Sequence, residues 1–223
     1  MASREEIDPD ALLGLSIFPL PNAVLLPGGL MPLHVFEPRY REMTRDCLDG
    51  SRLMAVARLR PGYEAAYAGR PAVYPACGLG RIIASEELAD GRFLLVLRGL
   101  ARVHIERELP ARASYRQVHA RVLDDDQTDR PDAARAGHAR LLELCDRLSL
   151  VLDRGGDELR ALCRECSSPG GCADAIAAAL IMDLGERQRL LETLDPVERL
   201  ERTAAHVGRL LCQLAPCAGR AVN

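Results

Sequence analysis

The segment Phe18–Leu48, FPLPNAVLLPGGLMPLHVFEPRYREMTRDCL, combines two apolar runs, a turn and a helical pattern. Val24–Leu26 is predicted to be extended and to stop at a turn formed by Pro27–Gly29. Met31–Phe36 then resumes as a second strand. Proline cannot donate a ladder hydrogen bond, so Pro32 is expected at a strand end or on a sheet edge.

The pattern becomes helical after Glu37. Pro38 suits the first position of a helix, where its missing N–H costs nothing. Apolar residues recur on one helical face, and Gly50 supplies a stop. The residues of that face are Tyr40, Met43, Cys47 and Leu48. The segment therefore predicts a strand–turn–strand–helix unit.

These residues resemble the opening of the Lon substrate-binding domain, the amino-terminal domain of Lon proteases. Phe-Pro-Leu, Leu-Pro-Gly and Pro-Leu-His-x-Phe-Glu-Pro-Arg-Tyr occur in the family's order and spacing, and ERQRLLETLDPVERL at 186–200 is similar to helices that follow the domain. The resemblance implies a β-rich PUA-like fold and a non-catalytic polypeptide-binding module. We expect a stand-alone member without ATPase and protease domains.

The motif residues are expected to be structural rather than binding residues. They are Phe18, Pro19, His34, Phe36, Glu37, Pro38, Arg39 and Tyr40. Glu37 and Pro38 are expected to set the helix start, Tyr40 to pack inward and Arg39 to pair with a carboxylate. His34 is expected to be a hydrogen-bonded sheet residue. A binding role for Glu37, Arg39 and Tyr40 is the open alternative.

The hydrophobic period changes from strand-like to helix-like along the chain. Residues 1–14 are polar and predicted to be a flexible arm, and 15–123 carry strand signals, among them the hairpin dipeptide Asp90-Gly91. The acidic segment 124–130 is predicted to be a linker. Residues 131–223 then read as a helical bundle. The expected fold class is α+β: an amino-terminal β-rich PUA-like pseudo-barrel followed by a carboxy-terminal helical bundle.

Five helices are predicted in the bundle from apolar periodicity. They are centred on Leu141–Val151, Leu159–Cys166, Ile176–Ile181, Leu190–Leu194 and Val197–Leu214. Ser167–Gly171 is expected to end the second helix. Asp195 and Pro196 are expected to cap and open the last one.

Composition limits the possible functions. The 223 residues carry a net charge of −3, so no overall basic field attracts nucleic acid or an anionic membrane. The first residues lack the layout of a signal peptide, and no apolar run is long enough to span a bilayer. We expect a cytoplasmic protein, no membrane partner, and eight cysteines present as thiols.

Every one of the 29 basic residues is arginine. A phosphate-binding GxxxxGK[ST] loop and a serine–lysine dyad are therefore chemically impossible, and neither GxSxG nor HExxH occurs. The sequence predicts no enzymatic activity and no cofactor.

Two other functions need consideration. Cys163, Cys166 and Cys172 have a metal-like spacing that Cys145, His138 or Cys212 would have to complete. Such a site would make the chain a cysteine- or zinc-dependent enzyme. The simpler interpretation is that these thiols are small hydrophobes on a buried helix face, so that no metal is bound.

RNA binding is the first alternative function, because some PUA-type relatives bind RNA and the end of the β region is rich in arginine. The arginines are Arg98, Arg102, Arg107, Arg112, Arg116 and Arg121. Neighbouring carboxylates dilute their field, and aromatic stacking platforms are scarce. Nucleic acid is therefore not the expected partner.

The expected partners are unfolded or client polypeptides and, as their recipient, a separate protease or ATPase. The proline-interrupted loop is the predicted contact surface, since its apolar residues flank a turn expected to reach solvent. These residues are Leu25, Leu26, Pro27, Leu30 and Met31. The alternative is that they simply pack beneath the helical half of the chain.

Overall fold

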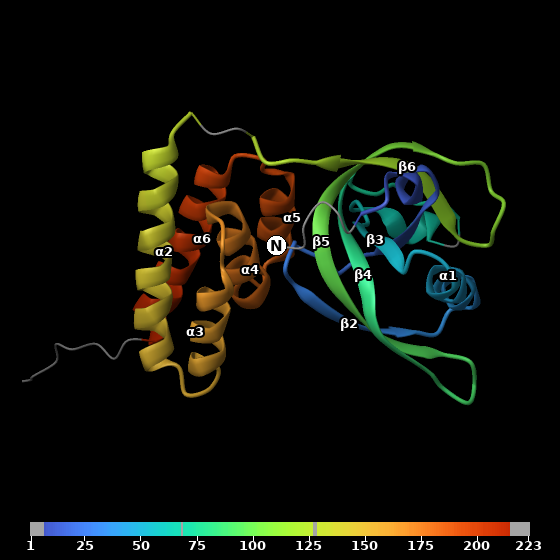
Figure 1. Cartoon of the computed structure of the whole chain (residues 1–223). Helices are drawn as coiled ribbons and strands as arrows, with labels where there is room; N and C mark the ends of the chain where they lie inside the picture. The colour runs from blue at the N-terminus through green and yellow to red at the C-terminus, as the bar shows by residue number, and fades with distance from the viewer. Residues whose placement is uncertain (1–6, 68, 127–128, 215–223) are drawn as a thin grey trace, which may run out of the picture. The chain divides into compact units, whose positions relative to one another are not determined.

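The structure is a computed structural model that describes residues 7–67, 69–126 and 129–214. It divides into two compact units, which we describe separately. The first consists of Met1–Asp124 and Asp183–Glu192, and the second of Asp125–Met182 and Thr193–Asn223. Strands dominate the first unit and helices make up the second (Figure 1). The expected α+β class is confirmed.

A closed sheet forms the first unit. Its strands are β1 (Leu15–Leu20), β2 (Leu30–Val35), β3 (Leu53–Arg58), β4 (Ala76–Glu87), β5 (Phe93–Glu108) and β6 (Arg116–Leu123). The order is β2-β5-β4-β3-β1-β6, and β6 also pairs with β5, so five strands close into a barrel and β2 adds a flap to β5. The β1–β3 pairing is parallel and the others are antiparallel.

Apolar side chains fill both sides of the barrel wall. One core cluster draws members such as Ile17, Leu79 and Val103 from the five closed strands and fills the inside. The other lies under α1 (Pro38–Asp49) and includes Tyr40 and Met43. β3 contributes to both clusters, which is why its sequence is a continuous apolar run rather than an alternation.

The prediction of a flexible arm at 1–14 is wrong for Pro9–Gly14. Pro9–Gly14 forms a 3-10 helix, η2, whose start is held by a hydrogen bond from the Asp10 N–H to the Asp8 carboxylate. Leu12 is only 7% exposed and belongs to the core inside the barrel. Burial of Leu12, with Ile7 and Ala11 packed against the same core, therefore orders a segment whose overall polarity indicated an arm. Residues 1–6 lie outside the described part of the chain.

The helix predicted around Leu190–Leu194 forms as α5 (Leu184–Glu192), but it belongs to the β-rich unit and not to the bundle. Polar side chains attach it to main-chain carbonyls. Arg58 donates to the carbonyl of Leu184 (2.9 Å), Arg102 to that of Leu190 (3.4 Å), and Gln188 of α5 to that of Ala76 (3.1 Å). Helical periodicity shows that α5 has an apolar face but not which core receives that face.

Four helices form the second unit: α2 (Pro131–Val151), α3 (Gly156–Glu165), α4 (Pro169–Leu180) and α6 (Pro196–Leu214). Asp195 opens α6 as predicted, because its carboxylate accepts from the Val197 N–H at 2.8 Å. The expectation for Ser167–Gly171 needs correction, since Ser168 caps α4 and the Pro-Gly-Gly that follows is its first turn.

Part of the predicted linker is anchored within the second unit. Arg199 of α6 is fully buried and pairs with Asp125 (2.6 Å) and with Asp174 of α4 (3.2 Å). It also donates to the carbonyls of Thr193 and Leu194. A buried guanidinium needs such partners because its desolvation is costly. Residues 127–128 lie outside the described chain.

The segment before β2 crosses two strands at very short distance. Leu26 to Gly29 forms the predicted turn, with the Gly29 N–H donating to the Leu26 carbonyl (3.0 Å) and Gly28 at φ 78°. Val24–Leu26, predicted to be a strand, is instead a buried crossing without ladder pairing. A Cβ on Gly78 would lie 1.9 Å from the Leu25 carbonyl oxygen, and one on Gly99 would lie 2.1 Å from that of Leu26.

Replacing Gly78 with alanine is therefore expected to lower the free energy of unfolding by ~3 kcal/mol or more, because the clash is with main-chain atoms that cannot rotate away. Gly14→Ala, in the same unit, is the matched control: no atom lies within 4 Å of the position its methyl group would take, and we expect a change below ~0.5 kcal/mol. Urea unfolding followed by circular dichroism measures both. Equal effects of the two substitutions would contradict the crossing.

A second pair of substitutions separates the two ends of the predicted loop. Leu26 is 1% exposed and Leu30 is 65% exposed. Leu26→Ala is expected to cost ~2–5 kcal/mol of unfolding free energy through a core cavity, whereas Leu30→Ala should cost less than ~0.5 kcal/mol. The same denaturation measurement tests both, and a stable Leu26→Ala variant would place that side chain outside the core.

Candidate functional site

The predicted polypeptide-binding loop does not form one accessible surface. Leu25 and Leu26 are buried, at 2% and 1% exposure, against β4 and β5. Pro27 and Met31 are half-buried, and Leu30 alone of the five projects into solvent. The expectation for Leu25 and Leu26 is thus wrong, because the sheet glycines leave room for their main chain to approach and their side chains enter the core.

The register of β2 determines which of its residues are available. The Gly99 N–H donates to the Gly29 carbonyl (2.8 Å). From that point, residues of β2 whose main chain faces β5 alternate with residues whose main chain faces away from it. Side-chain burial also alternates: Met31, Leu33 and Val35 face inward, and the other residues face solvent. Those outward residues are Leu30, Pro32 and His34.

Neighbouring strands extend this exposed side. Leu94 of β5, 43% exposed, lies opposite His34, and the half-buried Val96 lies opposite Pro32. On β4, Ala84 pairs with Val96, and Ile83 is 44% exposed. We call this surface the outer apolar face; it consists of Leu30, Pro32, Ile83, Ala84, Leu94 and Val96.

A β-bulge brings Ile83 to the surface. Ile82 pairs with Leu97 and Ala84 pairs with Val96, so Ile83 is an extra residue without a partner on β5. Ile82 is buried while Ile83 and Ala84 are both exposed. The β4–β5 hairpin continues beyond the bulge as a long ribbon beside β2 (Figure 1).

The outer apolar face is hollowed into a shallow groove of about 600 Å³. Residues of β2, β4 and β5 line it, and the polar ones include His34, Ser85 and Glu86. Within the described chain β2 pairs with β5 alone, so its other edge is open. Pro32 removes a donor from that edge, because its backbone points away from β5. The groove therefore offers side-chain contacts better than it offers a template for strand addition.

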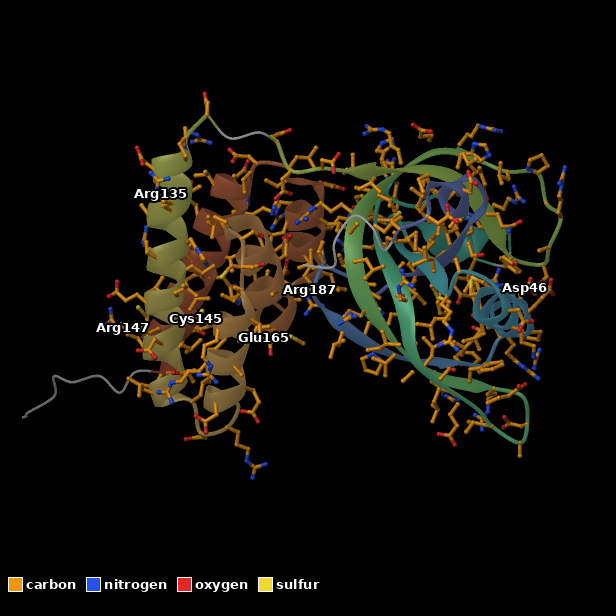
Figure 2. The ribbon with its side chains drawn as sticks, viewed as in Figure 1. Asp46, Arg135, Cys145, Arg147, Glu165 and Arg187 are labelled. Atoms are coloured by element: carbon orange, nitrogen blue, oxygen red, sulfur yellow. The ribbon has the colours of Figure 1, made fainter. Side chains whose placement is uncertain are left out.

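Most of the motif residues hold α1 in place. Phe18 and Tyr40 pack ring to ring with centroids 4.5 Å apart, and burial raises the pKa of Tyr40 to about 12. Glu37 accepts from Arg39 (3.0 Å) and from the Tyr67 hydroxyl (2.9 Å). These are the inward packing and the ion pair expected from the sequence. The Asp46 carboxylate, labelled on α1 in Figure 2, accepts from the Tyr115 hydroxyl (2.7 Å) and ties the same helix to the strand region.

Two of the motif residues are exposed instead. Phe36 is 60% exposed, and its ring centroid lies 6.0 Å from that of His34. His34 lies within β2 on its solvent side, and its ring lines the groove. The ring of Phe36 continues the outer apolar face past the end of β2.

The arginines considered for RNA binding make different contacts and do not act as one basic surface. Arg102 is 4% exposed and donates to the Leu190 carbonyl of α5, and Arg116 pairs with Glu108 (2.7 Å). Arg121 lies 3.6 Å from Glu106. Arg98, Arg107 and Arg112 are exposed. Carboxylates thus neutralise part of the basic surface that an RNA backbone would need.

The cysteines considered as metal ligands all lie in the second unit. Cys172 is buried in α4, while Cys163 and Cys166 at the end of α3 are half-buried. Among the residues that the structure describes, no group of three or more His, Cys, Asp or Glu is placed to hold a metal ion. None of the helices in the described ranges is long and apolar enough to cross a membrane.

Ile83, Leu94 and Val96 were not identified from the sequence as surface residues. Leu94 and Val96 lie in the run FLLVLRGL, whose nearly continuous apolar character suggests burial on both faces. The sequence signal for their exposure is position in the strand: Phe93, Leu95 and Leu97 face inward, so the residues between them face outward. The bulge that exposes Ile83 has no comparable signature in the sequence.

Comparison with known proteins places this geometry in a family. The model of the family described as ATP-dependent protease La (LON) substrate-binding domain matches residues 14–209. Lon protease 2 of Myxococcus xanthus is 26% identical over 187 residues, which are 84% of this chain and 22% of that protein. Lon protease 2 of Syntrophobacter fumaroxidans is 27% identical over 206 residues, which are 90% and 25% of the two chains. The chain therefore spans about a quarter of the length of these relatives.

Solved structures agree with the sequence match. The N-terminal domain of Mycobacterium avium complex Lon protease has a TM-score of 0.69 at 18% identity, covering 87% of this chain and 98% of that one. The Lon N-terminal domain protein from Xanthomonas campestris has a TM-score of 0.55 at 25% identity, covering 86% and 97%. Because the family match extends from the barrel through most of α6, this chain belongs to the Lon substrate-binding domain family.

Proposed function

We propose that this chain is a non-catalytic module that binds unfolded or exposed apolar segments of other polypeptides at the outer apolar face. The observation that carries the proposal is the apolar groove of about 600 Å³ between β2 and the β4–β5 hairpin, with Leu30, Ile83 and Leu94 exposed around it. Substrate recognition is the role for which the family is described. Clustered exposed apolar side chains are typical of interaction sites.

Binding would proceed by burial of client side chains rather than by a specific polar pattern. Each well-buried leucine-sized side chain contributes ~1.5–3 kcal/mol, and ordering of the client offsets part of that gain. The polar residues His34, Ser85 and Glu86 line the groove beside its apolar residues. A shallow apolar groove with these polar residues suits clients of varied sequence and affinities on the order of micromolar.

Catalysis is not part of the proposed role. The absence of lysine removes the serine–lysine dyad and the phosphate-binding loop from this chain. A client held here would be passed to a protease or ATPase for processing. We therefore propose an adaptor function in the cytoplasm, in which the groove selects clients by exposed apolar sequence.

Replacing Leu30 and Leu94 together with serine is expected to weaken client binding at least ~10-fold, because two apolar contacts of the groove region are lost. Leu150→Ser is the matched control, since Leu150 is 69% exposed on α2 and should leave affinity unchanged. Fluorescence anisotropy of a labelled, permanently unfolded polypeptide, titrated with each variant, measures the dissociation constants.

A labelled single-stranded RNA provides the contrasting probe. Polypeptide binding by apolar burial should persist as salt is raised, whereas arginine–phosphate contacts would weaken steeply. Equal binding by the double variant, the Leu150→Ser variant and the unaltered chain would refute the assignment of the groove. Saturable, salt-sensitive binding of RNA without binding of polypeptide would refute the proposed function itself. Unfolding curves of each variant verify that folding is intact.

A further inference from the structure

Four cysteines come together in the helical unit. Cys145 lies on α2, Cys163 on α3, Cys166 at the carboxy-terminal cap of α3, and Cys172 near the start of α4. All four belong to or pack against one apolar core, formed with residues such as Leu141 and Leu159. Figure 2 labels Cys145, which projects from α2 into the bundle. The proposed client groove uses none of these residues.

The four thiols contact one another as two pairs. The Cys145 thiol is hydrogen-bonded to that of Cys163, and the Cys172 thiol to that of Cys166. In each pair one member is fully buried and the other is half-buried, with Cys163 and Cys166 on the accessible side. Each pair therefore joins a protected sulfur to one that a small reagent can reach.

The pairing also makes the two members chemically unequal. The hydrogen bond from Cys145 lowers the pKa of Cys163, and the one from Cys172 lowers the pKa of Cys166. The same hydrogen bonds, together with burial, raise the pKa of Cys145 and Cys172. The accessible sulfurs are thus the better nucleophiles, since the thiolate is the reactive form.

We propose that these thiols form a reversible redox site, in which Cys163 and Cys166 react with a peroxide and then form disulfides with Cys145 and Cys172. The assignment follows from the contacts of the sulfurs and their different accessibility. It is independent of the proposed client binding. In a reducing compartment such a site would be oxidised only transiently.

The chemistry balances with hydrogen peroxide as the oxidant. The thiolate of Cys163 attacks one peroxide oxygen, the O–O bond breaks, and a sulfenic acid forms while the released hydroxide takes up the proton that the thiol lost. The sulfur of Cys145 then attacks the sulfenic sulfur, an S–S bond forms and the S–O bond breaks. The departing hydroxide takes the proton of the Cys145 thiol and leaves as water. Two thiols and one peroxide give one disulfide and two waters, and Cys166 with Cys172 follows the same steps.

Oxidation would join α3 covalently to its neighbouring helices. This helix has 10 residues, and Gly155, in the left-handed region at φ 84°, stands before it. One disulfide would join its last turn to α2 and the other would join its cap to α4. A loop closed by a disulfide loses conformational freedom in the unfolded chain, so the oxidised bundle should unfold at higher denaturant than the reduced one.

Other cysteines of the chain supply internal controls. Burial raises the pKa of Cys47 to about 11 and that of Cys77 to about 12. A thiol pKa of about 11 in place of the ordinary 9.0 corresponds to about 100-fold less thiolate at neutral pH. Cys47 and Cys77 should therefore resist both alkylation and peroxide, whereas Cys163 and Cys166 should react.

The test uses the full chain with Cys212 and Cys217 replaced by serine, which prevents disulfides between molecules. The protein is reduced, treated with a small excess of hydrogen peroxide, alkylated and mapped by peptide mass spectrometry. We expect disulfides Cys145–Cys163 and Cys166–Cys172, a mass lower by two hydrogens for each, full reversal by dithiothreitol, and alkylation of Cys47 and Cys77 only after unfolding.

A second variant traps the intermediate. In Cys145→Ala, the sulfenic acid of Cys163 should persist and react with dimedone, whereas in the unaltered pair it should not accumulate. The mapping of the unaltered cysteines needs no core substitution, so it decides the question even where Cys145→Ala fails to fold. Four unreacted thiols after peroxide, a different disulfide pairing, or stoichiometric zinc or iron in the freshly purified protein would overturn the proposal.

Discussion

The close approach of the Leu25 and Leu26 main chain to Gly78 and Gly99 is the constraint on which the β-rich unit depends. No other residue type leaves room for carbonyl oxygens at that distance. The contact fixes where the chain turns, because Gly28 and Gly29 exchange hydrogen bonds with Gly99. That turn sets the register of β2 on β5, and the register decides which side chains face solvent. The groove is thus a consequence of glycines that lie outside it.

Arg199 has a comparable role in the helical unit. Its guanidinium has no exposed surface. It pairs with the carboxylates of Asp125 and Asp174, which are distant in the sequence, and donates to the main-chain carbonyls of Thr193 and Leu194. Gly170 makes room for it, since a Cβ there would lie 2.4 Å from the Arg199 nitrogen. A buried ion pair of this kind adds little net stability compared with an apolar core, but removing either partner leaves an uncompensated charge. It therefore favours one arrangement of α4, α6 and the residues around Asp125.

Local chemistry explains which parts of the structure the sequence predicts correctly. Pro27 and Gly28 specify a turn, Pro38 a helix start and Asp195 a cap, each through the conformations of a few adjacent residues. The errors have a common cause, which is dependence on distant partners. Leu26 is buried because Gly99 permits it. The helix α5 joins the barrel because Arg58 of β3 donates to the Leu184 carbonyl and Gln188 of α5 donates to the Ala76 carbonyl. The site could be predicted only at Leu30, since its other members depend on strand register.

Arginine side chains in this protein bind several acceptors at once, which a lysine ammonium group could not do in the same geometry. A guanidinium carries five donors in a planar fork, so Arg199 can bind carboxylates and carbonyls at once, and Arg116 can hold both Glu108 and the carbonyl of Pro71. An ammonium group would leave several of these acceptors unsatisfied in the interior. The arginines thus serve as cross-links between segments, and the apolar groove and the thiol pairs remain as the chemically distinctive features. Because these two features lie in units with separate cores, side chains of one can be altered without disturbing the packing around the other.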